Sequence, residues 1–166
     1  MKKITNAIVI SCALLLSSCA TQMVQKSPEE VKMMTTKQFE TNKSLVFKSA
    51  ISLLQSESYL VEDANESTGL IRASKRIENG KKANSARFKA KTSKISIYIE
   101  DINPELSEVK ITLYEGNESV SYNYYGYFAT SKNKDYSENM INSPEIYNNW
   151  FNNLRAEIER RKALTQ

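Results

Sequence analysis

Histidine is absent from the chain, and cysteine, proline, glycine and tryptophan are scarce, with two, three, four and one residues respectively among 166. Without histidine the chain lacks the commonest general base at neutral pH and the commonest nitrogen ligand for metals. Ser-His-Asp and Cys-His nucleophile arrangements are therefore excluded, and no phosphate-binding loop or zinc-ligand spacing appears. The sequence predicts no enzyme, no catalytic residue, no metal site and no cofactor.

The two cysteines have different surroundings and do not form a structural pair. Cys12 lies within an apolar segment, residues 4–16, that follows a basic start, Lys2-Lys3. This layout is typical of a secretory signal, because the apolar run is shorter than the roughly 20 residues that a bilayer-spanning helix needs. Cleavage of such a signal leaves Cys19 without a cysteine partner, so no intrachain disulfide is expected.

Small residues lead directly to Cys19. The stretch Leu16-Ser17-Ser18-Cys19 resembles the lipobox of bacterial lipoproteins, in which the cysteine is acylated and becomes the first residue of the mature chain. The resemblance implies that residues 1–18 are a signal peptide and that Cys19 is the lipid-attachment site. Because the next residue is alanine and not the aspartate that retains lipoproteins at the inner membrane, the expected location is the outer membrane, facing the periplasm.

The 148 residues from Cys19 onward are enough for one domain with its own core. Residues 19–31 are mostly polar without periodicity, which predicts a lipidated N-terminus and a flexible tether. Within it, Ser27-Pro28-Glu29-Glu30 is suited to cap one helical turn, with Pro28 at the first helical position. Residues 32–166 are predicted to form a single α+β domain. Loss of the two lysines of the signal lowers the formal net charge from +4 to +2. Export makes a nucleic-acid partner unexpected.

Hydrophobic spacing predicts two helices separated by antiparallel strands. Helical spacing is seen over residues 44–56 and, after a Ser143-Pro144 cap, in a stripe formed by Tyr147, Trp150, Phe151, Leu154 and Ile158. A weakly patterned first strand is predicted within 32–39, and alternation predicts strands at 59–64, 70–77, 88–99 and 109–113. A bulge is expected near Thr92-Ser93, a strand end at Gly116-Asn117, a fifth strand or ordered loop at 120–128, and irregular chain at 130–142.

This order predicts an α+β fold, with an antiparallel sheet of four to five strands in a meander and two helices packed on one face. The other face of the sheet is left open to solvent or to a partner. Two adjacent carboxylate pairs, Glu62-Asp63 and Glu100-Asp101, do not suggest a catalytic dyad, because neighbours on a strand point to opposite faces.

Two long segments together resemble a family of small bacterial envelope lipoproteins that has no assigned reaction: KQFETNKSLVFKSAISLLQSESYLVEDANESTGLIRASK and, downstream, INSPEIYNNWFNNLRAEI. The residues that carry the likeness are Phe39, Thr41, Leu54, Gln55, Gly69, Leu70, Ile71, Pro144, Tyr147 and Phe151. The resemblance implies a non-enzymatic, membrane-anchored protein that acts as a structural or accessory component of the envelope through contacts with an envelope protein or a surface. The alternative is a periplasmic ligand-binding or inhibitor module that uses the open sheet face.

Charge is unevenly distributed along the strands. Residues 72–94 carry nine basic residues and one acid, while residues 100–118 carry six acids and one base. One interpretation is mutual neutralisation between neighbouring hairpins. The other is contact with anionic lipid headgroups or an acidic partner, and the candidate residues are Lys75, Arg76, Lys81, Lys82 and Arg87.

An aromatic run, residues 122–128, provides a second candidate contact. Tyr122 and Tyr124 share one face if the chain is extended there. Exposed tyrosines could stack on sugars or form a protein interface. The competing interpretation is an edge strand whose aromatic residues pack against the final helix.

Overall fold

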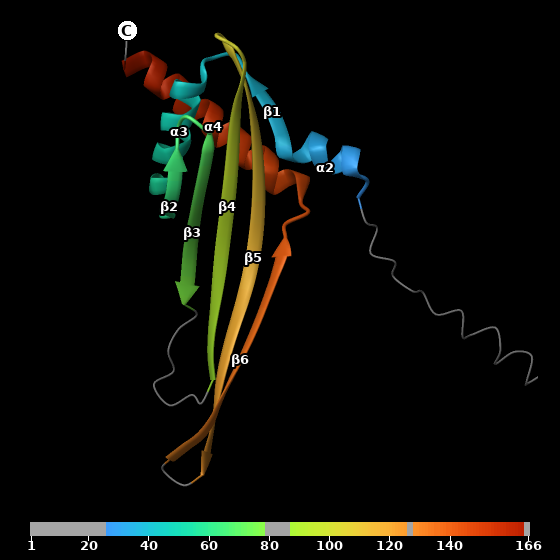
Figure 1. Ribbon diagram of the computed structural model, residues 1–166, viewed down its shortest axis with the longest axis vertical. Helices are drawn as coiled ribbons and strands as arrows, with labels where there is room; N and C mark the ends of the chain where they lie inside the picture. Colours follow the sequence, from blue (N-terminus) through green and yellow to red (C-terminus); the bar gives the residue numbers. More distant parts are fainter. Residues whose placement is uncertain (1–25, 79–86, 126–127, 165–166) are drawn as a thin grey trace, which may run out of the picture.

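The computed structural model describes residues 26–78, 87–125 and 128–164 of the chain (Figure 1). The α+β class is confirmed, but the predicted numbers of strands and helices were too low, because the described residues form six strands and three helices. The elements are, in chain order, α2 (Pro28–Thr35), β1 (Thr36–Phe39), α3 (Lys43–Ser56), β2 (Leu60–Asn65), β3 (Leu70–Glu78), β4 (Arg87–Asn103), β5 (Leu106–Tyr125), β6 (Phe128–Met140) and α4 (Pro144–Leu164).

All six strands belong to one antiparallel sheet. The order is β1-β5-β4-β3-β2, and β6 also pairs with β5. Strands β2 to β6 therefore form a meander, as predicted. β1 pairs with residues 107–110 of β5, and β6 pairs with residues 114–125, so that β1 and β6 share one edge of β5 at different heights.

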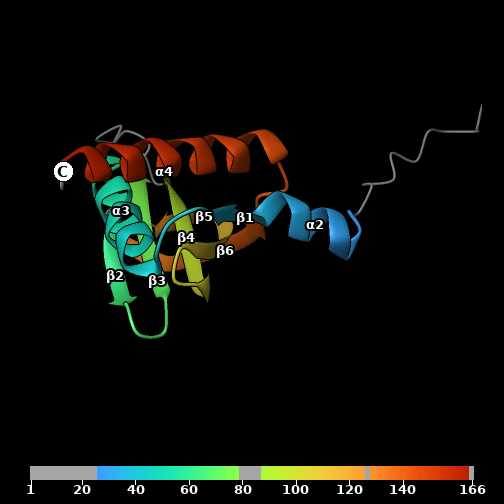
Figure 2. The same ribbon diagram turned by 90° about the horizontal axis from the view of Figure 1, so that it is seen from above.

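Helices α3 and α4 lie together on one face of the sheet, as predicted (Figure 2). The α3 helix begins after Asn42, whose side chain accepts a hydrogen bond of 2.9 Å from the Leu45 backbone N–H. The third helix, α2, begins with a capping box between Ser27 and Glu30 and extends to eight residues the single turn that was predicted there. It starts at Pro28, inside the segment expected as tether. No helix in the described ranges has the length and apolar character needed to cross a bilayer.

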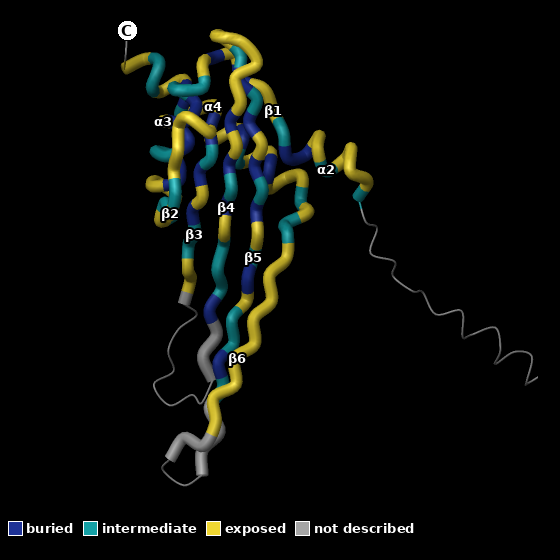
Figure 3. The backbone as a smooth tube through the Cα atoms, in the orientation of Figure 1, coloured by how far each residue is buried: buried dark blue, intermediate teal, exposed yellow. Residues whose placement is uncertain are grey.

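The hydrophobic core lies between the sheet and α3 and α4 (Figure 3). The most deeply buried strand residues come from β3, β4 and β5, and each is at most 1% exposed: Ile71, Ile97, Ile99, Val109 and Ile111. From α4, Phe151 packs with its ring centroid 6.3 Å from that of Phe39. Trp150 is half-buried and meets Tyr59 edge to face at 5.6 Å. The aromatic stripe of the last helix is thus part of the core, as its spacing predicted.

The strands β4, β5 and β6 continue well past the helices (Figure 1). The 20 residues of β5 span about 65 Å, whereas the 21 residues of α4 span about 30 Å. We call the part beyond the helix-covered sheet the projecting arm; it comprises residues 87–94 of β4, 114–125 of β5 and 128–140 of β6. Pairing within it is continuous between β4 and β5.

Two predictions failed in the projecting arm. β5 does not end at Gly116-Asn117, and the chain over 130–142 is not irregular, since most of it belongs to β6. The reason is that every side chain from 131 to 139 is exposed, so burial imposes no alternation on the sequence. The strand is instead held by backbone pairing with β5.

The predicted bulge near Thr92-Ser93 is also absent, because the register between β4 and β5 runs without a shift from Arg87 to Asp101. The bulge was predicted because the apolar positions of the strand switch from even-numbered residues, such as Ala90, to odd-numbered ones, such as Ile95. Ala90 is buried, but it alternates with the helix-facing residues and so lies on the opposite face of the sheet.

A short section of the β5 edge lies between the start of β1, at Thr36, and the end of β6, at Met140. There the Leu113 N–H donates a hydrogen bond of 3.2 Å to the Tyr147 hydroxyl, and the Leu113 carbonyl accepts one of 2.9 Å from the Ile141 N–H. Burial raises the pKa of the Tyr147 hydroxyl. Tyr147 of α4 thus provides a hydrogen-bond acceptor for the Leu113 N–H, which neither β1 nor β6 pairs with.

Candidate interaction surface

The face of the sheet opposite α3 and α4, which we call the open face, is polar and carries exposed tyrosines. Alternation along β4 turns Ile97 and Ile99 toward the helices and Tyr98 away from them. Tyr98 is 43% exposed, Tyr114 on β5 36% and Tyr136 on β6 51%. The open face is therefore a surface with separate aromatic rings and not a continuous apolar patch.

Charged residues on the open face pair with one another. The distance between Lys94 Nζ and Glu138 Oε2 is 2.9 Å, and the Tyr136 hydroxyl donates a hydrogen bond to the same carboxylate. Glu118 lies 3.0 Å from Lys134 and 3.4 Å from Arg76. These contacts favour neutralisation between strands as the interpretation of the charge blocks.

The pKa values of the two carboxyl groups follow from these contacts. The hydrogen bond from Tyr136, followed by that from Lys94, lowers the pKa of Glu138. The hydrogen bond from Lys134 lowers the pKa of Glu118. Both groups are therefore carboxylates at neutral pH, and they offset the neighbouring cations.

The five basic candidates from the sequence do not form one described patch. Lys75 lies on the helix side, where its Nζ donates a hydrogen bond of 2.9 Å to the Glu57 carbonyl, and Arg76 lies on the open face beside Glu118. Consecutive strand residues point to opposite faces, so these two cannot contact one flat surface together. Lys81 and Lys82 lie outside the described residues, as does the side chain of Arg87.

The aromatic candidates are placed only by their backbone. Tyr122 pairs with Lys132 and Tyr124 with Ala129, with a register shift between positions 123 and 124 of β5. The side chains of both tyrosines lie outside the described ones, so their shared face stays a prediction. Cys19 also lies outside the described residues.

A groove of about 380 Å³ adjoins Tyr98 where α2 approaches the sheet. Its lining contains two cations and two anions among small polar and apolar groups: Pro28, Val31, Lys32, Thr35, Thr36, Tyr98, Glu100, Glu108 and Lys110. Over residues 26–78, 87–125 and 128–164, no cluster of three acidic or cysteine side chains is arranged to hold a metal ion. The arrangement on the open face is suited to binding polar molecules.

The contact residues predicted from the sequence do not include Tyr98, Tyr114 or Tyr136. A signal for Tyr98 was present, because it alternates with buried Ile97 and Ile99 in a predicted strand. Tyr136 was missed because its segment was predicted to be irregular.

Comparison with known proteins gives only distant structural likenesses. No protein-family model matches the chain, and no curated protein matches it. Among solved structures, a TBP-like protein from Parabacteroides distasonis ATCC 8503 is similar over 75% of this chain and 90% of its own, with 14% identity and a TM-score of 0.37. A DUF4468 family protein from Bacteroides ovatus ATCC 8483 is similar over 60% and 58%, with 15% identity and a TM-score of 0.28.

Proposed function

We propose that the protein is a lipid-anchored accessory protein of the bacterial envelope, attached through Cys19 and acting through surface contacts instead of catalysis. The observation that carries the proposal is the division of the sheet. One half is covered by helices and forms the core, while the projecting arm and the open face expose polar and aromatic side chains. Extended surfaces of this kind serve binding, and the lipobox-like stretch supplies the anchor.

The distance from Cys19 to the folded domain supports this arrangement. Lys26 is fastened to the domain, since its Nζ donates a hydrogen bond of 2.6 Å to the Asn142 carbonyl. Lys26 is seven positions after Cys19, which corresponds to a reach of at most about 24 Å. From the pairing of Thr36 with Lys110, β5 continues for fifteen residues, or about 50 Å. The projecting arm is thus long enough to reach well beyond the tether.

The proposed location is the outer membrane, with the domain in the periplasm and an envelope protein or surface as its partner. Contact of the basic hairpin, including Lys81 and Lys82, with an anionic surface belongs to this proposal. A second candidate is a ligand-binding or inhibitor module that uses the open face. The groove beside Tyr98 favours it, because small-molecule sites are concave and combine apolar walls with a few polar groups.

Replacement of Cys19 by serine tests the anchor. Each buried methylene contributes about 0.8 kcal/mol to membrane binding, so two or more acyl chains hold a protein stably. Cys19→Ser is expected to accumulate as soluble or unprocessed protein, whereas the matched control Cys12→Ser fractionates with membranes as wild type does. The measurement is fractionation with mass analysis of the mature N-terminus. A Cys19→Ser variant that is cleaved after residue 18 and still stays in the membrane fraction would refute the proposal.

A further inference from the structure

The three exposed tyrosines of the open face form a regular diagonal row. In the register of the sheet, Tyr98 on β4 lies opposite Lys110, Tyr114 lies on β5 itself, and Tyr136 on β6 lies opposite Glu118. Each step along the row therefore advances four residues along β5 and one strand across. At about 3.3 Å per residue and 4.8 Å per strand, successive positions are about 14 Å apart. We call this set the tyrosine row.

Neighbouring residues hold the last ring of the row in place. The hydroxyl end of Tyr136 lies over Gly116, where an added Cβ would be 3.0 Å from the hydroxyl oxygen. The hydroxyl donates to Glu138, and Lys94 Nζ lies 3.2 Å from it and 5.7 Å from the ring centroid. A ring that is held this way while 51% exposed loses little conformational freedom on binding.

Lysines and small polar residues alternate with the rings. Lys110 is paired with Tyr98, and Lys94 with Tyr114. Midway between these two pairs, Ser96 is opposite Thr112. The tyrosines are thus separated by hydrogen-bonding groups, so the row lacks the continuous apolar centre that a stable protein interface requires.

The charge of the open face indicates which polar ligand fits. Lys94, Lys134 and Arg76 pair with Glu138 and Glu118, and the groove beside Tyr98 carries two cations and two anions, so the charges of these residues cancel to within one unit. A surface with balanced charge is complementary to a ligand with little net charge, and not to a polyanion, which binds through unpaired cations. Flat amphipathic rings complement the apolar faces of sugars, while the intervening hydroxyl and ammonium groups complement sugar hydroxyls.

We propose that the tyrosine row binds an extended glycan strand, which crosses the open face diagonally from the groove beside Tyr98 to Tyr136. Tyr98, Tyr114 and Tyr136 stack on separate sugar rings, and Ser96, Thr112 and the adjacent lysines hydrogen-bond to the sugars between them. The choice of the cell-wall glycan as the strand rests on the proposed envelope location; the binding of a glycan rests on the row alone.

Co-sedimentation with purified cell-wall sacculi, stripped of protein, tests the inference. The full-length protein is purified in detergent, and the bound fraction is measured against the amount of sacculi. Wild type is expected to bind saturably. Tyr98→Ala, Tyr114→Ala and Tyr136→Ala should each weaken binding about three- to tenfold, the factor that one aromatic stacking contact contributes. The triple variant should lose binding.

Matched variants separate stacking from folding. Tyr98→Phe and Tyr114→Phe keep the ring and should bind within about twofold of wild type. Leu60→Ala changes an apolar residue that is more exposed than the three tyrosines, 71% on the β2 edge, and should leave binding unchanged. If the triple alanine variant does not fold, the sacculus binding of the three single alanine variants tests the inference. Wild type that fails to sediment, or a triple variant that sediments like wild type, would overturn the inference.

The remaining outcomes distinguish this inference from the proposed function. Soluble oligosaccharides prepared from the same sacculi should compete with binding in proportion to their length. Capture of an envelope protein through the tyrosine row, without binding to bare sacculi, would replace the glycan by a protein partner and refute the inference. Membrane attachment that does not depend on Cys19 would refute the anchor and leave sacculus binding unaffected.

Discussion

The helix-covered part of the sheet and the projecting arm share the strands β4 and β5 but are held together differently. Under α3 and α4, Ile97, Ile99 and Ile111 are at most 1% exposed. In the arm, every side chain from 131 to 139 is exposed, and the described contacts include ion pairs such as Lys94–Glu138 and Lys91–Glu115. Exposed ion pairs contribute about 0–1 kcal/mol each, whereas burying one large apolar side chain contributes about 1.5–3 kcal/mol.

This difference shows that the residues that stabilise the fold and the residues that form the proposed contact surface occupy different stretches of the strands. The helix-covered half supplies most of the apolar burial that opposes conformational entropy. The projecting arm adds backbone pairing and a polar surface but little burial. Substitutions of buried side chains in the first region should therefore have large effects on unfolding, whereas substitutions of exposed side chains in either region should have small effects.

The largest expected effect comes from the core. Phe151→Ala removes an aromatic side chain that is 2% exposed, and it should lower the free energy of unfolding by about 3–5 kcal/mol. Ile146→Ala, on the same helix at a residue 39% exposed, is the matched control and should have little effect. Chemical denaturation measures both. Equal, small changes would show that α4 is not a main source of stability.

Two glycines offer a comparison between the regions. Gly69 has φ +75°, and an added Cβ would lie 1.9 Å from the Ile99 carbonyl oxygen, so Gly69→Ala should cost about 2–4 kcal/mol. In the arm, a Cβ at Gly116 would lie 3.0–3.4 Å from the Tyr136 side chain, which needs to shift by only a few tenths of an ångström, and Gly116→Ala should cost less than about 1 kcal/mol. Thermal unfolding of both variants checks the order. A more damaging change at Gly116 would break the comparison.

The boundary between the regions should show an intermediate effect. Tyr147→Phe removes the hydroxyl that accepts the Leu113 N–H and leaves a buried donor unpaired, which costs about 1–3 kcal/mol. Tyr114→Phe removes a hydroxyl from a residue that is 36% exposed and should be nearly neutral. Denaturant midpoints compare the two. If Tyr147→Phe is also neutral, the hydroxyl is not needed to close the gap between β1 and β6.

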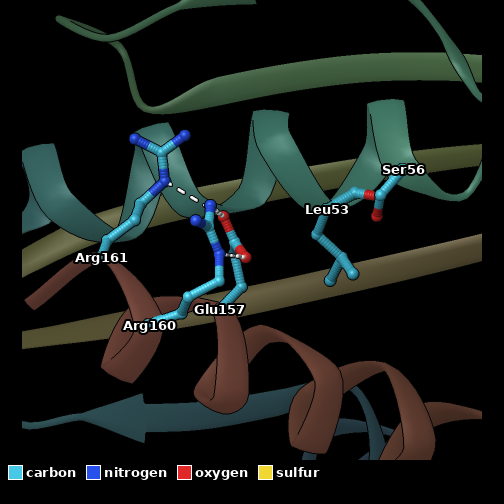
Figure 4. Close-up of polar contacts among 5 residues, drawn as sticks. All are labelled: Leu53, Ser56, Glu157, Arg160 and Arg161. Atoms are coloured by element: carbon cyan, nitrogen blue, oxygen red, sulfur yellow. Dashed lines mark hydrogen bonds and ion pairs between the residues drawn. The ribbon is translucent and has the colours of Figure 1, made fainter. Parts of the chain in front are cut away.

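The smallest effect is expected from an ion pair on the helix-covered half. Glu157 accepts hydrogen bonds of 2.6 and 2.7 Å from Arg160 and one of 3.2 Å from Arg161 (Figure 4). The Arg160 guanidinium lowers the pKa of Glu157 from 4.5 to about 2. The stabilisation is therefore present above about pH 4.5 and is lost as the pH falls toward 2.

The corresponding variant is Glu157→Gln, which should cost about 0.3–1 kcal/mol at neutral pH. Its difference from wild type should shrink as the pH falls from 4.5 to about 2. Urea denaturation at several pH values measures the dependence. A difference that is constant across this window would mean that the carboxylate charge is not the source of the stabilisation.

The sequence predicted the elements that bury a face. Phe47, Leu54 and Phe151 follow helical spacing, and Ile97 and Ile111 alternate along strands, so apolar burial left a periodic signal at these positions. β6 left none because its residues from 131 to 139 stay exposed, and α2 was expected as a single turn because few of its residues are buried. The tyrosine row could not be predicted from the sequence for a third reason. Tyr98, Tyr114 and Tyr136 are aligned only by strand register, which no local sequence pattern specifies.

Native-state hydrogen exchange on the full-length protein tests the division of the sheet most directly. Amide protection reports the free energy of local opening, which approaches the global value in core strands and falls toward zero in loosely held ones. We predict near-global protection for paired amides over residues 107–113 of β5 and markedly weaker protection over 116–125 and throughout β6. Uniform protection along the whole of β5 would contradict the separation of a stable helix-covered half from a contact-bearing projecting arm.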